Sequence, residues 1–172
     1  TAPNGKTRFL NRLFLDYVGD MMSDKKFIGD QVVGRLKEVM IAATDPDFWE
    51  LALKKRIVIQ MNNSDDARYV AFYRTHPVSA ITHVAEVDFT EKNAEPKTAL
   101  RGFPKLIRRG KEAGWFDKPQ KLYHLKELVE LAAPIRKRPG KPAIRVTAFK
   151  GMADLLKARY LDDLFRVKLK GR

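Results

Sequence analysis

The strongest constraint on the fold of this chain is the stretch of residues 68–88, which reads RYVAFYRTHPVSAITHVAEVD. Two runs rich in β-branched and aromatic residues flank a short polar stretch that contains Pro77. Such runs are typical of β-strands, and proline cannot donate a ladder hydrogen bond inside a central strand. The pattern therefore predicts strands at about residues 68–73 and 79–89, joined by a turn at residues 74–78.

The residues before these strands divide into helical and extended stretches. Apolar side chains recur at helical spacing in two of them. They predict one helix through Phe9, Leu10, Leu13, Phe14, Tyr17, Val18 and Met21, and a second through Val32, Val33, Leu36, Val39, Met40 and Ala43. Asp45 can cap a third helix that begins at Pro46, a residue suited to the first helical position. Residues 57–61 predict a strand, and residues 62–66 predict a polar turn.

The residues after the strand pair are less regular. Glycine and proline interrupt residues 90–120, where a short helix fits residues 104–112. Residues 121–133 fit a strand in part and a helical turn in part, and residues 136–142 read as an exposed loop. A strand at 144–149 and a closing helix from Met152 to Leu161 follow. The pattern predicts an α+β fold, with a curved sheet or small open β-barrel and flanking helices. It divides into an N-terminal helical segment, 1–55, and a main domain, 56–172.

The charge of the chain favours an anionic partner. The 172 residues carry a net charge of +13, and residues 97–145 hold 14 Lys and Arg against 4 Asp and Glu, which is +10 of that total. Such asymmetry indicates DNA or RNA, although a solvated basic surface would read the same way. No apolar run approaches the roughly 18 residues of a membrane helix, so no membrane partner is expected.

The cysteine count and the search for a leader segment bear on the expected cellular compartment. The chain has no cysteine, which excludes disulfides and thiolate metal ligands. It shows no secretory n-region or h-region, so a cytoplasmic protein is expected. It does not begin with Met, which is compatible with a piece of a larger effector protein.

The strand pair and the closing elements together resemble a known superfamily. The phrases Val70-Ala71-Phe72-Tyr73 and Ile81–Val87, with the later stretch Ile144–Leu164, are similar to PUA-like domains, especially EVE and ASCH domains, over about residues 56–165. The resemblance implies a small curved sheet with a concave pocket for a flipped or single-stranded base. Relatives include YTH readers of methylated adenine and sensor domains of modification-dependent restriction enzymes. A few ASCH-type proteins are nucleoside amidohydrolases.

Aromatic and basic residues supply the candidates for nucleic-acid contact. A base outside its stack needs aromatic stacking and edge contacts, and the phosphates need cations. Trp115 reads equally well as a core residue, and Phe116 reads better as one. The expected contact residues are Tyr73, Arg74, His76, Trp115, Phe116, Arg101, Lys105, Arg108, Arg109, Arg136, Lys137 and Arg138. Of these, Arg101, Lys105, Arg108 and Arg109 would share one side of a helix.

No catalytic, metal or cofactor site is expected. The spacing of His76, His83 and His124 is not that of a metal site, and phosphate-loop, dinucleotide, zincin and hydrolase-elbow motifs are missing. The sequence therefore predicts a binding module that reads a modified or flipped base, for example as the sensor of a restriction system. Two alternatives stay open. One is an ASCH-like nucleoside amidohydrolase using Glu86 and a nearby lysine, and the other is a structural RNA-binding protein of a ribonucleoprotein.

Overall fold

A computed structural model describes residues 37–61 and 65–165. Its strands are β1 (Lys37–Thr44), β2 (Ile57–Met61), β3 (Ala67–Arg74), β4 (Ala80–Ala94), β5 (Gln120–Arg136) and β6 (Ala148–Lys150). Its helices are α2 (Pro46–Lys55), α3 (Pro96–Ala99), α4 (Pro104–Glu112), the 3-10 helix η2 (Trp115–Asp117), α5 (Met152–Lys157) and α6 (Leu161–Phe165). The expected helix through Phe9 and Met21 lies outside the described residues.

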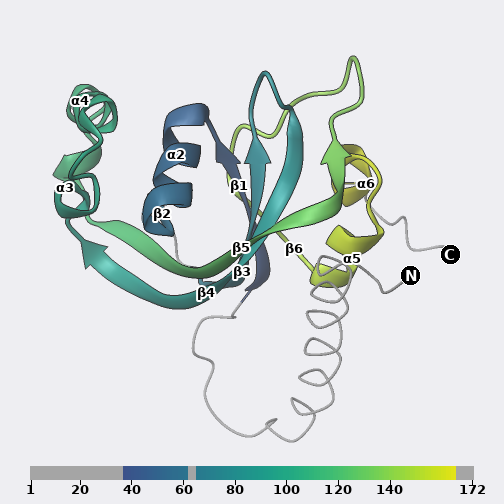
Figure 1. Ribbon diagram of the computed structural model, residues 1–172, viewed down its shortest axis with the longest axis horizontal. Coiled ribbons are helices and arrows are strands. Elements are labelled where there is room, and N and C mark those ends of the chain that lie inside the picture. Colours follow the sequence, from purple (N-terminus) through teal and green to yellow (C-terminus); the bar gives the residue numbers. More distant parts are fainter. Residues whose placement is uncertain (1–36, 62–64, 166–172) are drawn as a thin grey trace, which may run out of the picture.

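The strands form one curled sheet in the order β2-β5-β4-β3-β1-β6 (Figure 1). In the described part of the chain β1 and β3 run parallel, and the other neighbouring strands run antiparallel. The Thr147 hydroxyl donates a hydrogen bond to Gln60 Oε1 at 2.7 Å, which links the approach to β6 with β2. The two outer strands of the sheet therefore come close, as in a nearly closed barrel. The expected α+β fold with a curved sheet is confirmed.

The second predicted helix is wrong in its described half, because Val39, Met40 and Ala43 belong to strand β1. Val39 and Ile41 enter one buried cluster, whereas Met40 and Ala42 enter the cluster on the opposite face of the sheet. A strand that is buried on both faces reads as a continuous apolar run, and such a run is not distinguished from a buried helix by periodicity alone. β1 pairs with β3 and β6, while the division of the chain at residues 55 and 56 stays a prediction.

The helix and strands from Asp45 to the β3–β4 turn agree closely with those predicted from the sequence. The Asp45 carboxylate accepts a hydrogen bond from the Phe48 amide at 3.0 Å, and Pro46 opens α2, so the predicted start of this helix is confirmed. The predicted strands at 57–61, 68–73 and 79–89 are confirmed as β2, β3 and β4. The turn between β3 and β4 contains a cis peptide bond before Pro77.

The long strands β4 and β5 continue past the part that pairs with β3, with β2 paired along the far part of β5, and their tip carries α3, α4 and η2 (Figure 1). The ambiguous residues 121–133 are strand throughout, and the short helix at 104–112 is confirmed. Phe116 lies against Gly110, where a Cβ atom would meet a ring carbon of Phe116 at 2.5 Å, so this position of α4 requires glycine. The tip packs on α2 through a small apolar cluster around Leu51, Leu100 and Leu106.

The C-terminal elements differ from expectation in two places. Residues 144–147 are not strand, and β6 contains only residues 148–150. The closing helix is interrupted at residues 158–160 and continues as α6. α5 and α6 cover one face of the sheet, and α2 covers the other. Among the described residues, no helix combines the length and apolarity that crossing a membrane requires.

Candidate nucleic-acid interface

Most of the expected contact residues lie along one edge of the molecule, which runs from α4 past the β3–β4 turn to the loop at 137–147 (Figure 1). Contacts between side chains and between backbone groups connect these pieces. Arg109 of α4 pairs with Asp45 at the start of α2, and the guanidinium of Arg74 lies 4.7 Å from the ring centroid of Trp49 in α2. The Lys137 amide donates to the Ser79 carbonyl at 3.0 Å. We call this surface the basic edge. Its cations with exposed or half-buried side chains include seven that make no ion pair with another described residue: Arg74, Arg101, Lys105, Arg108, Arg136, Lys141 and Arg145.

At the α4 end, Lys105 and Arg108 are exposed on the helix, and Arg101 is exposed just before it. None of the three makes an ion pair with another described residue. The expected stripe of four cations on one side is wrong for Arg101, which precedes the helix, and for Arg109, which turns toward α2. This end therefore presents these three cations, together with the exposed Lys111 in the last turn of α4, and they can contact phosphates without breaking an internal ion pair.

Arg109 is bound within the protein. Its guanidinium donates to Asp45 at 2.6 Å and to Asp47 at 3.2 Å, and it lies 5.5 Å from the Phe48 ring centroid and 5.9 Å from that of Trp115. Burial by itself raises the pKa of Asp45, but hydrogen bonds from Arg109 and from the Phe48 amide outweigh it, so this pKa is lower than the usual 3.8. Arg109 therefore joins α4 to α2.

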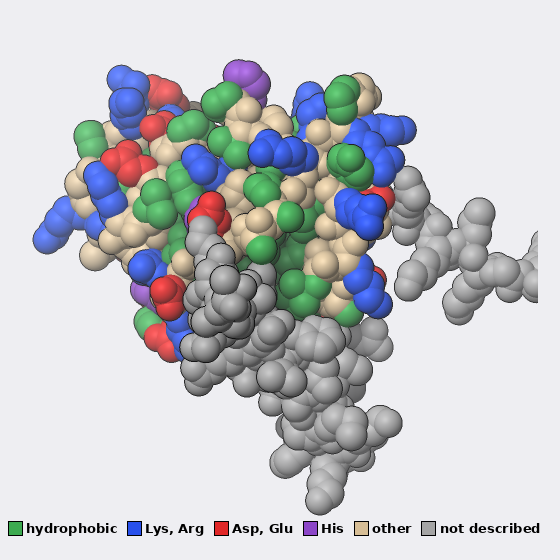
Figure 2. Space-filling view, turned by 45° about the vertical axis from the view of Figure 1, so that its right-hand side comes forward, with side chains coloured by type: hydrophobic (Ala, Val, Ile, Leu, Met, Phe, Trp, Pro, Cys, Tyr) green, Lys and Arg blue, Asp and Glu red, His purple; other side chains and the backbone are tan. Residues whose placement is uncertain are grey.

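The loop end repeats this division between paired and exposed cations. Arg138 pairs with Asp162 at 3.2 Å and Asp163 at 3.7 Å, and its guanidinium lies 4.1 Å from the ring centroid of Tyr160. Lys137 Nζ donates to the Lys141 carbonyl at 2.9 Å. The exposed cations here are Arg136, Lys141 and Arg145. Figure 2 shows Lys and Arg side chains gathered on the side of the molecule that carries this loop and α6.

Between the two ends lies a stack of aromatic and cationic side chains. Arg74 covers Trp49, and the ring centroids of Trp49 and His83 are 4.7 Å apart. Arg74 and Arg136 both lie opposite Ala80 in the strand register, so the two cations share one face of the sheet. His76 is exposed on the adjoining turn. The sequence pattern did not indicate His83 for this place, and Trp49 is only 7% exposed.

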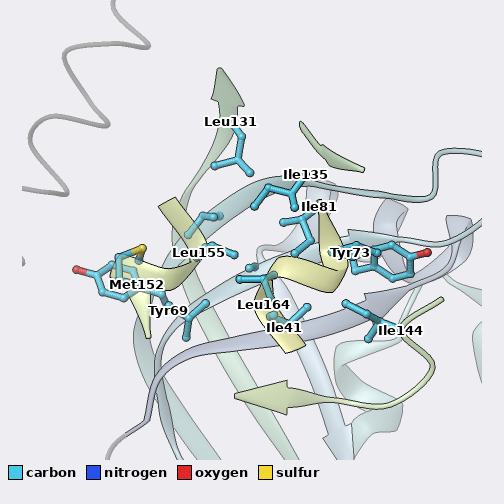
Figure 3. Close-up of a cluster of buried hydrophobic side chains, with 14 residues drawn as sticks. Ile41, Tyr69, Tyr73, Ile81, Leu131, Ile135, Ile144, Met152, Leu155 and Leu164 are labelled. Carbon is cyan, nitrogen blue, oxygen red and sulfur yellow. The ribbon is translucent and has the colours of Figure 1, made fainter. Parts of the chain in front are cut away.

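Tyr73 is not available as a stacking residue in this structure. It is fully buried, and it lies among Ile41, Ile81, Ile144 and Leu164 (Figure 3). Strand alternation and a register shift after Phe72 turn it into the core beneath α6 and the 137–147 loop. Burial raises the pKa of its hydroxyl, which has no hydrogen-bond partner among the described residues. Its position at the end of a strand, next to Arg74, could not reveal this orientation.

The two other expected aromatic residues lie at the α4 end. Phe116 packs on Gly110 and the cluster around Leu106, which fits the core reading. Trp115 is half-buried, its ring centroid is 5.6 Å from that of Phe48, and its carbonyl accepts from Gln120 Nε2 at 2.8 Å. Its contact with nucleic acid stays a prediction.

A cavity of about 420 Å³ lies at the loop end, between the segment 141–148 and α6. Apolar side chains form most of its wall: Pro142, Ala143, Ile144, Val146, Ala148, Leu161 and Phe165. Lys141, Arg145 and Asp162 complete it. Sequence reasoning missed this cavity because its walls come from two segments that only the fold brings together.

Glu86, considered as a catalytic base, and the histidines, considered as metal ligands, contact other side chains. Glu86 pairs with Lys126 at 3.1 Å across β4 and β5, and neither residue lines the cavity at the loop end. His124 stacks on Phe89 with ring centroids 4.1 Å apart, and His83 contacts the Thr82 hydroxyl at 2.9 Å. Within residues 37–61 and 65–165, no group of three His, Asp or Glu side chains could hold a metal ion.

Comparison with known proteins identifies the fold. No protein-family model and no curated protein matches the sequence. Three solved structures of an ASCH protein from Zymomonas mobilis are similar to this one. The ASCH protein itself gives a TM-score of 0.51 at 13% identity, over 69% of this chain and 92% of that chain. Its serine-to-alanine mutant gives 0.52 at 12%, over 70% and 94%, and its tyrosine-to-phenylalanine mutant gives 0.53 at 11%, over 70% and 96%.

A sequence identity of 11–13% supports similarity of fold and nothing further. The resemblance to ASCH domains that the strand phrases indicated is confirmed for the fold, because the described residues form a curled sheet similar in structure to that ASCH protein.

Proposed function

We propose that this protein binds DNA or RNA along the basic edge and reads a modified or flipped base there. The observation that carries the proposal is the set of exposed cations at both ends of one edge, none of which is used in an ion pair with another described residue. Phosphate contacts supply affinity without sequence information, so these cations would set the strength of binding. Arg74 over Trp49 and the half-exposed Trp115 supply surfaces on which a base could stack.

The experiment is a binding panel of single- and double-stranded DNA and RNA at several salt concentrations, each with and without base methylation. Neutralising about six phosphates predicts a slope near −4 to −5 in a plot of log affinity against log salt, with single strands at the shallow end. Lys105→Ala combined with Arg108→Ala should reduce the magnitude of that slope by about 1.5 to 2, since each lost contact removes about 0.7 to 0.9.

A matched control removes a cation away from the basic edge. Lys126→Ala takes away a lysine that pairs with Glu86 across β4 and β5, and it should leave the salt slope unchanged. An affinity that is independent of salt, or equally reduced by the control, would contradict binding along the basic edge. Equal affinity for methylated and unmethylated strands would remove base reading, and with it a role as the sensor of a restriction system, but would leave nucleic-acid binding in place.

A further inference from the structure

The cavity at the loop end has the size and lining of a small-molecule site. Its volume of about 420 Å³ lies within the range of roughly 300–1,000 Å³ that such sites occupy. Seven of its ten lining residues are apolar, among them Phe165, whose ring is 42% exposed, and Val146, which is 75% exposed. These apolar side chains lose contact with water if a flat, uncharged group enters.

Cations dominate the charged part of the cavity wall. Lys141 and Arg145 line it with exposed side chains that make no ion pair with another described residue. Asp162, the acidic residue of the wall, is paired with Arg138 at 3.2 Å. A ligand that combines an apolar body with an anionic group therefore complements this site, and a purely apolar ligand would leave its cations unused.

The walls are held in place at both ends of the segment 141–148. At its start the Lys141 carbonyl accepts from Lys137 Nζ at 2.9 Å, and near its end the Thr147 hydroxyl donates to Gln60 at 2.7 Å. Between them Ile144 is 9% exposed and packs in the same buried cluster as Leu161. A wall fixed in this way loses little conformational entropy when a ligand binds.

We infer that this cavity accepts one unstacked nucleobase of a bound strand, with Lys141 and Arg145 contacting the neighbouring phosphates. The inference rests on the proposed function and gives the base a site that Tyr73 does not provide. Arg136, at the loop end of the basic edge, pairs through its backbone with Tyr160 just before α6, so the cavity lies beside the proposed path of the strand. Taking a base out of its stack costs a few kcal/mol, and stacking on an aromatic ring such as Phe165 returns about 1–3 kcal/mol.

The test uses the full chain and a single-stranded oligonucleotide with one central 2-aminopurine, whose fluorescence is quenched while it is stacked on its neighbours. Binding should raise the fluorescence severalfold as the base enters the cavity. Val146→Glu places a carboxylate on an exposed part of the wall and should abolish the rise, while anisotropy still reports binding by the remaining cations. Leu53→Glu makes the same kind of change at a 49% exposed position on α2 and should keep the rise.

The two proposals fail in different ways. If the wild type binds neither this oligonucleotide nor any strand of the binding panel, the proposed function fails, and the base site fails with it. If it binds without a rise in fluorescence, or if the rise persists in Val146→Glu, the base site is overturned and nucleic-acid binding stands.

Discussion

The two ends of the basic edge are built alike but differ in what lies beneath them. At each end one arginine bridges two aspartates near the start of a helix and lies close to an aromatic ring: Arg109 at the α4 end and Arg138 at the loop end. Other cations around each paired arginine stay exposed. At the α4 end the cluster around Leu106 lies beside a smaller cavity of about 180 Å³, whose wall includes Asp47 and Glu50, whereas at the loop end a mostly apolar cavity of about 420 Å³ opens beside α6.

This difference separates two tasks within one charged surface. Exposed cations over a filled core can hold phosphates, and they do so with little regard for sequence. Discrimination between bases needs a place where one base can leave its stack and be enclosed. In the proposed function, both ends would therefore set the strength of binding and the loop end would set base selectivity.

The largest expected effect concerns the core beneath the loop end. Tyr73→Ala should lower the free energy of unfolding by about 3–5 kcal/mol, because it empties a fully buried aromatic site. Tyr73→Phe keeps the ring and should change stability by less than about 1 kcal/mol. Urea denaturation checks both values. Loss of base selectivity by the folded Tyr73→Phe protein would contradict the assignment of Tyr73 to the core.

At the α4 end, neighbouring arginines should separate stability from binding. Arg109→Ala removes two ion pairs and should lower the free energy of unfolding by about 1–2 kcal/mol, a range that allows for the 37% exposure of the side chain. Arg108→Ala should cost less than about 0.5 kcal/mol but weaken nucleic-acid binding. Thermal unfolding and binding titrations of both variants test this. Equal stability of the two variants would break the distinction between paired and exposed cations.

At the loop end the difference in unfolding free energy between the variant of the paired arginine and the variant of the exposed arginine should be smaller. Arg138→Ala should cost about 0.5–1 kcal/mol, since its contacts of 3.2 and 3.7 Å are longer than those of Arg109. Arg136→Ala should leave stability unchanged within about 0.5 kcal/mol and should weaken binding of all strands. Denaturation of this pair of variants, measured beside the α4 pair, shows whether the two paired arginines play equivalent roles.

The smallest effect is a dependence on acid pH at the α4 end. The pKa of Asp45 is lower in the folded protein than its usual 3.8, so its ion pair stabilises the fold above that pH and stops doing so as pH falls through the lowered value. The difference in unfolding free energy between wild type and Arg109→Ala should therefore shrink below about pH 4. The corresponding difference for Arg108→Ala should stay flat from pH 6 to about pH 3. A constant Arg109→Ala difference over this range would show that Asp45 contributes nothing to the pair.

Local chemistry made much of the fold predictable. Three features depend only on residues adjacent in the chain, so the sequence identified them. They are the helix cap at Asp45, the turn that contains Pro77 and the strands rich in β-branched residues. Strand β1 was not predicted because both of its faces are buried, which removes the alternation of apolar and polar residues that distinguishes a strand. Residues 144–147 alternate like a strand, but only residues 148–150 pair with β1.

The candidate site was less predictable than the fold. Composition located the positive charge in the second half of the chain, and that is a property of residue counts. It could not distinguish Arg108 from Arg109, or Arg136 from Arg138, because only the aspartates brought near by folding decide which arginine is paired. The cavity wall likewise joins residues 141–148 to α6 across the chain.

The amino-acid sequence alone determined that this protein has an α+β fold and a strongly basic second half, because strand propensity, capping and charge are local quantities. The tertiary structure alone decided that Tyr73 is core, that two of the arginines are structural and that an apolar cavity opens among the remaining cations. Burial and ion pairing depend on distances between segments remote in the chain, and those distances exist only once the sheet has curled.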